Sequence, residues 1–192
     1  HFRILDHMGT MSSLYGKGTG NSLSYLPALT RQYHYMLANL NPYQVNGREE
    51  CAVPLDLFYT LRSGSDRNKY WIFRANASSA FTIDRMQSDN GERRLLWMDL
   101  NADAECHWNR QLRTTFLYSR QEWSPSHGYE EGTYASNIFV ADAQYKFNKK
   151  YALRGELQYL YSKDYERDWV AALAEFTFAP QWSIYATEMY NL

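Results

Sequence analysis

Four residues with metal-binding side chains lie close together in one stretch of the chain: Asp99, Asp103, Glu105 and His107. Carboxylates and imidazoles are common ligands of Ca²⁺ and Zn²⁺. In a strand, however, residues two apart on one face lie about 7 Å from each other, too far to share an ion without neighbouring strands. We therefore favour a ladder of charges in which Arg74 and Arg113, on the flanking strands, pair with these acids. We predict no metal site and no cofactor.

Other candidate catalytic motifs are incomplete. The segment Y-G-K-G-T-G at 15–20 lacks both the spacing of a phosphate-binding loop and the helix that should follow, so it is better interpreted as a flexible loop. A hydrolase would need a histidine near a serine or carboxylate at matching depth. His107 and His127 are expected at opposite ends of their strands, and no triad is evident. We predict that the chain is not an enzyme.

The segment 122–133 is a second candidate site because it mixes aromatic and acidic residues. Trp123, His127 and Tyr129 could bind a sugar, a peptide or a partner protein. The simpler interpretation, which we favour, is a solvated loop with Trp123 in an aromatic belt at a membrane interface.

The elements that must position these residues are strands that alternate apolar and polar side chains. Between Tyr151 and Tyr161, one face is apolar and aromatic and the other carries Arg154, Glu156 and Gln158. Successive side chains of a strand point to opposite faces, so this alternation predicts a half-polar sheet. The same pattern predicts nine strands, with a further strand at 2–8. The nine are expected at 33–41, 50–60, 69–81, 94–108, 111–121, 134–147, 151–161, 167–178 and 182–190.

Strand length and loop length favour a membrane barrel over a water-soluble sheet. A tilted membrane strand needs about 9–11 residues, whereas soluble strands average about 5–6. From residue 82 onward, long polar connections alternate with short turns such as 109–110 and 148–150. Outer-membrane barrels have this arrangement, with long loops outside and short turns in the periplasm.

Residue parity then divides the strands into two faces. The first face is apolar and would face lipid; it carries Trp71, Phe73, Leu96, Met98, Leu100, Phe116, Tyr118 and Phe139, among others. The second would line the lumen, with Asp56, Arg74, Asn76, Asp99, Asn101, Asp103, Glu105, Arg113, Asp142, Gln144, Arg154, Glu156, Gln158 and Glu175. A charge in lipid is costly, so confinement of the charges to one parity is informative. Strand 182–190 is not oriented by this rule, because Ile184 and Glu188 share a face.

Composition is consistent with this interpretation. The chain has 192 residues, a net charge of -1 and 17% aromatic residues, including 17 Tyr and 6 Trp. Without a basic excess, nucleic acid is not an expected partner. Tyr and Trp are suited to membrane interfaces. Cys51 and Cys106 are expected at opposite ends of their strands and should not form a disulfide.

A local motif adds a family resemblance. The segment G-N-S-L-S-Y-L-P-A-L-T at 20–30, followed by Gln32 and Tyr35, resembles a stretch of a Bacteroidetes family of outer-membrane β-barrel proteins of uncharacterised function. The Tyr-rich hairpins from Lys150 to Tyr190 are similar to that family as well. The resemblance implies an outer-membrane location and a part of a larger barrel. It implies no catalytic residues.

We therefore expect an all-β, up-and-down antiparallel transmembrane β-barrel with 9–10 strands in this chain. Residues 1–32 would form an N-terminal strand and an irregular lumenal segment, and 33–192 the barrel wall. The function expected is porin-like transport or a scaffold in an envelope complex, with lipid, a small solute or other envelope proteins as partners. Two alternatives remain open: a soluble or cell-surface all-β binding protein, and a scaffold whose lumen is plugged by residues 9–32.

Overall fold

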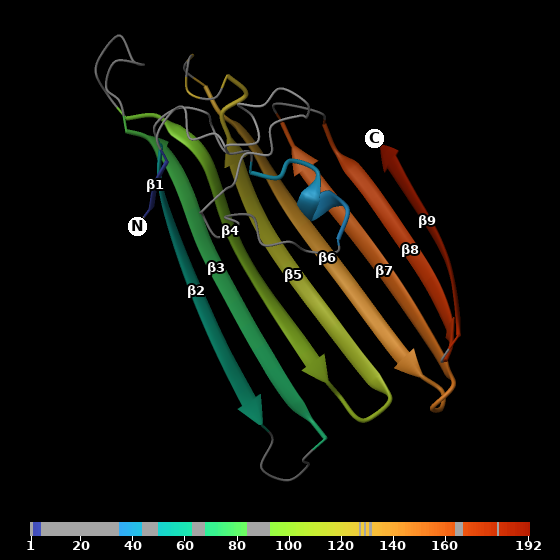
Figure 1. Cartoon of the computed structure of the whole chain (residues 1–192). Helices are drawn as coiled ribbons and strands as arrows, with labels where there is room; N and C mark the ends of the chain where they lie inside the picture. Colours follow the sequence, from blue (N-terminus) through green and yellow to red (C-terminus); the bar gives the residue numbers. More distant parts are fainter. Residues whose placement is uncertain are drawn as a thin grey trace, which may run out of the picture.

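The computed structural model consists of one antiparallel sheet in which each strand pairs with the next along the chain (Figure 1). It describes residues 2–4, 35–43, 50–62, 68–83, 93–126, 128, 130, 132–163, 167–179 and 181–192. The predicted all-β, up-and-down antiparallel fold is confirmed. The strands are β1 (Phe2–Ile4), β2 (Glu50–Arg62), β3 (Tyr70–Thr82), β4 (Leu95–His107), β5 (Leu112–Trp123), β6 (Tyr134–Lys146), β7 (Tyr151–Ser162), β8 (Trp169–Phe178) and β9 (Trp182–Asn191).

The sheet is open, with β1 and β2 at one edge and β9 at the other. β1 covers only the first residues of β2, from Glu50 to Ala52. The eight strands β2–β9 each have 10 to 13 residues. Strands of this length form because apolar residues alternate with polar ones over most of their extent. None of the helical residues described is part of a helix long and apolar enough to cross a membrane.

The strand predicted at 33–41 is wrong. The described part of this region contains a short 3-10 helix, η1 (Leu37–Asn39), with backbone hydrogen bonds from Asn39 to Met36 and from Leu40 to Leu37. The alternation of Met36, Ala38 and Leu40 suggested a strand, but Leu37 and Ala38 are both buried. Two consecutive residues cannot both point to one face of a strand, whereas a helical turn over an apolar surface can bury both. The lumenal segment predicted at 9–32 lies outside the described residues.

Two of the short turns share one stabilising device. The Asn109 side chain accepts hydrogen bonds from the backbone N–H groups of Gln111 and Leu112, at 2.8 and 2.7 Å. The Asn148 side chain does the same for Lys150 and Tyr151, at 2.7 and 2.9 Å. Asparagine favours such turns because its carboxamide can replace a backbone acceptor. The same geometry therefore closes the β4–β5 and β6–β7 hairpins.

Asn148→Ala is expected to lower the free energy of unfolding by about 1 kcal/mol, because two backbone donors lose their acceptor at an exposed site. The measurement is the urea concentration at the midpoint of unfolding. Lys149→Ala, in the same turn, is the control and should leave the midpoint unchanged. An equal loss in both variants would show that the Asn148 side chain does not stabilise the turn.

A β-bulge changes one face assignment. The register between β3 and β4 shifts after Ala80, which pairs with Trp97, while Phe81 pairs with Leu95. Leu96 is the extra residue. It was expected on the apolar face, but it packs with Ala52, Ala80 and Trp97 in a small buried cluster. A bulge inserts one unpaired residue and reorients its side chain, which parity alone does not reveal.

Candidate functional site

The two faces of the sheet have opposite character and opposite exposure. The apolar face carries Phe73, Ala102, Phe116, Ala141 and Leu157, and the polar face carries Arg74, Asp103, Asp142 and Gln158. Phe116 and Leu157 are 55% and 64% exposed, whereas Asp99 and Gln158 are 0% and 3% exposed. This inverts the usual pattern of a water-soluble protein, in which large apolar side chains are buried.

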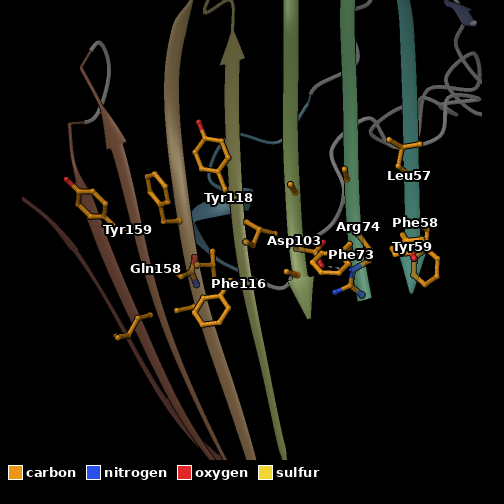
Figure 2. A pocket seen from close by; sticks show the side chains of 18 of the residues that line it. Leu57, Phe58, Tyr59, Phe73, Arg74, Asp103, Phe116, Tyr118, Gln158 and Tyr159 are labelled. Atoms are coloured by element: carbon orange, nitrogen blue, oxygen red, sulfur yellow. Dashed lines mark hydrogen bonds and ion pairs between the residues drawn. The ribbon is translucent and has the colours of Figure 1, made fainter. Parts of the chain in front are cut away.

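The apolar face contains a long shallow groove with a volume of about 1030 Å³ (Figure 2). Small residues, such as Ala75, Ala102 and Ala104, form its floor. Larger side chains stand on either side of these alanines; they are Leu57, Tyr59, Phe73, Phe116, Tyr118, Phe139, Leu157, Tyr159 and Val170. Most of these side chains are apolar, and the hydroxyls of Tyr118 and Tyr159 already donate to Asn137 and Asp168, so the groove suits contact with hydrocarbon.

Strand β9, which parity left unassigned, is oriented by its pairing with β8. Glu188 pairs with Ala172, and Ile184 pairs with Phe176, so both lie on the apolar face. Thr187 and Tyr185 lie on the polar face, opposite Leu173 and Glu175. Glu188 is thus a carboxylate on the apolar face at the open edge of the sheet.

One cluster of charges on the polar face joins β3, β4 and β5; we call it the Arg74 cluster. The guanidinium of Arg74 lies 2.6 Å from Asp103 and 3.1 Å from Glu105. Glu105 also contacts the His107 ring at 2.6 Å, and Arg113 lies 3.8 Å away. The ion pairs expected between Arg74, Arg113 and the acids of β4 are therefore present. Among the described residues, no group of three or more potential ligands is placed to hold a metal ion.

A row of hydrogen bonds from amide and hydroxyl groups continues across the same face. Asn76 donates to Asp56 at 2.8 Å and accepts from Asn101 at 3.3 Å. Ser119 donates to Asp99 at 2.8 Å. Buried polar groups need such partners, because an unpaired one costs free energy. The other carboxylate oxygen of Asp99 is buried without a hydrogen bond.

A second cluster joins β6 and β7; we call it the Arg154 cluster and define it as Asp142, Arg154 and Glu156. Arg154 donates to Asp142 at 2.7 and 3.0 Å and to Glu156 at 2.6 Å. Glu175 on β8 lies 3.9 Å from the same guanidinium. Arg74 and Arg154 thus each contact at least two carboxylates, and the acids at 2.6–3.1 Å from them are more deeply buried than the two arginines.

Residues 35–43, which we call the docked segment, lie over the polar face of β5–β7 (Figure 1). The Tyr35 hydroxyl donates to Asp142 at 3.3 Å, and the Leu37 backbone N–H donates to the Gln158 side chain at 2.8 Å. Burial, together with the nearby Asp142 charge, raises the pKa of Tyr35 well above its ordinary value. The hydroxyl therefore remains a donor throughout the physiological pH range.

Beneath the docked segment is an apolar surface that interrupts the polar face. Leu37 and Ala38 are fully buried against it. We call this surface the apolar seat; it consists of Leu117, Ile138, Val140, Leu160 and Ala171. The seat was not predicted from the sequence. A signal was present, however, because these apolar residues occupy the polar parity of four consecutive strands, β5–β8.

The family model described as a family of unknown function (DUF6029) matches residues 1–192. The chain belongs to this family. No curated protein and no solved structure matches it. Within this DUF6029 chain, all fourteen residues selected as lumen candidates lie on one face, and most are joined by the hydrogen bonds and ion pairs described above.

The remaining candidates of the DUF6029 chain lie elsewhere. Trp123 is the last residue of β5 rather than part of a loop, and it packs against the cluster of Leu96 and Trp97. His127 and Tyr129 lie outside the described residues. Cys51 and Cys106 are not joined to each other by a disulfide. Cys51 pairs with Phe81 near one end of β3, and Cys106 pairs with Trp71 near the other.

Proposed function

We propose that the chain forms part of the wall of a transmembrane β-barrel in the outer membrane of a Gram-negative bacterium. In this role it acts without catalysis, either in passage of a small solute or as a scaffold in an envelope complex. The observation that carries the proposal is the inverted sheet, with its apolar face exposed and its charged face buried and paired. The resemblance of residues 20–30 to Bacteroidetes outer-membrane proteins supports the same location.

The free energy of the apolar face supports contact with lipid. Burying a Leu or Phe side chain is worth about 1.5–3 kcal/mol, so a continuous exposed surface of such residues is unfavourable in water. More than ten large apolar side chains on this face are over one-third exposed, among them Phe116, Phe139, Leu157 and Ile184. In a bilayer the same residues would rest in hydrocarbon at no such cost.

Strand length and connectivity support the same role. Strands of 10 to 13 residues match the length that a tilted strand needs to cross a bilayer. The connections 83–94, 124–133 and 163–168 lie at one end of the sheet. The shorter 108–111, 147–150 and 179–181 lie at the other end, together with the seven-residue connection 63–69. That asymmetry is typical of barrels with long outer loops and short periplasmic turns.

The two edges of the sheet set a requirement on any such barrel. Unpaired backbone groups are not tolerated in lipid, so β2 and β9 must each have a partner strand. Because β2 and β9 are separated by an odd number of antiparallel pairings, they run in opposite directions. They can therefore close on each other, or accept further antiparallel strands that widen the barrel.

The polar face would then face the lumen, where its charges would act on a solute electrostatically. The Arg154 cluster brings one guanidinium against the carboxylates of Asp142 and Glu156, with Glu175 close by. Such an excess of carboxylates favours cations over anions in the lumen. This preference depends on ionic strength, because salt screens the charges.

Fractionation of the native protein tests the proposal. Membranes are washed with carbonate, and the retained protein is run on a gel with and without heating. We expect retention in the outer membrane and slower migration after heating, as for a folded barrel. Release by the wash would instead favour a soluble or cell-surface binding protein whose apolar face packs against another protein surface.

A further inference from the structure

We propose that the docked segment, residues 35–43, is a resident plug that occludes the lumen along β5–β8. The inference rests on the proposed function, because a plug requires a barrel. The sequence suggested a plug formed by residues 9–32, which lie outside the described residues. The docked segment is a different stretch of chain, and it contacts the wall directly.

The docked segment is deeply buried at its helical turn. Leu37 and Ala38 have no exposed surface, and Tyr35 is 4% exposed. They pack on the apolar seat, which is the one described apolar patch in the middle of the polar face that spans four strands. A lumen wall that met only water would be polar at these positions. The seat is therefore explained by a permanent apolar occupant, and Leu37 is that occupant.

Polar contacts around the seat anchor the docked segment to the wall. Tyr35 donates to one end of the Arg154 cluster, at Asp142. Gln158 donates to the other end, at Glu156, and its carbonyl oxygen accepts the backbone N–H of Leu37. Together with the main chain between Tyr35 and Leu37, these contacts form a closed ring. The buried charges of the Arg154 cluster thus help to attach the plug to the wall.

A third contact fixes the direction of the segment. The Gln121 side chain on β5 donates to the backbone carbonyl oxygen of Ala38 at 2.9 Å, and both groups are buried. Gln121 and Gln158 lie on strands separated by β6, so the segment is held across the sheet rather than along one strand. The backbone carbonyl of Ala38, which needs a hydrogen-bond partner once it is buried, thus finds that partner on the wall.

The size of the lumen makes this segment an obstruction. A barrel of about eight strands has an interior only wide enough for its own side chains or one small ligand. A helical turn with main chain and side chains about 10 Å across exceeds that space. A barrel closed by β2–β9 alone would therefore be filled by the docked segment, and a barrel with further strands would be narrowed by it.

Cysteine labelling tests whether the segment is docked, independently of the membrane. In a background with Cys51→Ser and Cys106→Ser, Ala38→Cys should react with a water-soluble maleimide at least tenfold more slowly than Pro42→Cys, which lies on the exposed part of the same segment. Adding Leu37→Asp should remove most of this protection. Equal labelling rates for Ala38→Cys and Pro42→Cys in the folded protein would overturn the docking.

Ion conductance in planar bilayers tests the occlusion. The wild-type barrel should be closed or nearly so, and Leu37→Asp should raise its conductance at least tenfold. Pro42→Asp adds the same charge at an exposed position of the segment and should behave as wild type. Tyr35→Phe, which removes one anchor and little volume, should give an intermediate conductance.

Three results would overturn the plug. An open wild-type pore with Ala38→Cys protected would show a docked segment that does not occlude. Unchanged conductance in Leu37→Asp would also show that the segment does not occlude the lumen, if fast labelling of Ala38→Cys shows that the segment has been released. Release of the protein by the carbonate wash would remove the barrel itself, and with it the plug, while the labelling result would still report the docking.

Discussion

Replacing Arg154 with methionine is expected to lower the free energy of unfolding by about 3–5 kcal/mol, because it leaves buried carboxylates without their counter-charge. The side chains of Asp142 and Glu156 are only 6% and 2% exposed, and Arg154 donates to both. Methionine keeps an unbranched, flexible side chain but provides no donor. One of the acids must then take up a proton or remain charged in a poorly solvated place.

The measurement is urea-induced unfolding of the folded protein in lipid, followed by tryptophan fluorescence. Arg113→Met is the matched control. Arg113 is 42% exposed and has a single 3.8 Å contact with Glu105, so its removal should cost less than about 1 kcal/mol. The triple change of Arg154→Met with Asp142→Asn and Glu156→Gln should recover part of the loss, since no charge is then stranded. Similar losses for both arginines would contradict the role given to the Arg154 cluster.

Phe116→Arg is expected to destabilise the membrane-embedded protein by about 2–4 kcal/mol, the cost of a cation on the lipid face near the middle of a bilayer. Phe116 lies within β5, is 55% exposed and borders the groove of the apolar face. Phe116 pairs with Ala104 and Ala141, so neither paired residue supplies an acid that could neutralise the charge. The arginine would have to reach the interface or draw water into the bilayer.

Phe147→Arg is the matched control, because it introduces the same side chain at a different depth in the membrane. Phe147 is 51% exposed and lies in the short turn after β6, where the membrane surface is expected. The same substitution should cost about 0–1 kcal/mol there. The free energies come from reversible unfolding in lipid vesicles. If Phe116→Arg were as mild as Phe147→Arg, the apolar face would not be in hydrocarbon.

Strand positions from residue 50 onward were predictable because they depend on local alternation alone. Each strand from β2 to β8 carries enough alternating residues to define its own two faces, as the neighbours Tyr118 with Ser119 and Leu157 with Gln158 illustrate. The turn asparagines were part of recognisable breaks between strands. Charged residues on one parity also anticipated the pairing of Arg74 with the acids of β4.

Register-dependent features were not predictable. Leu96 follows the parity of its neighbours in the sequence, but the bulge opposite Ala80 places it in a buried cluster. In β9, Ile184 and Glu188 share a face, and only the pairing with β8 identifies it as the apolar one. A sequence pattern contains the period of a strand but not its alignment with the next strand.

The amino-acid sequence by itself determined an all-β meander with one apolar and one charged face, because period-two alternation is a property of each strand taken alone. Only the tertiary structure decided where residues 35–43 lie. Their seat is assembled from Leu117, Ile138, Leu160 and other residues on four strands, and their anchors come from Asp142, Gln158 and Gln121. A binding surface built from separate strands exists only after those strands have paired, so no local pattern in the docked segment could reveal it.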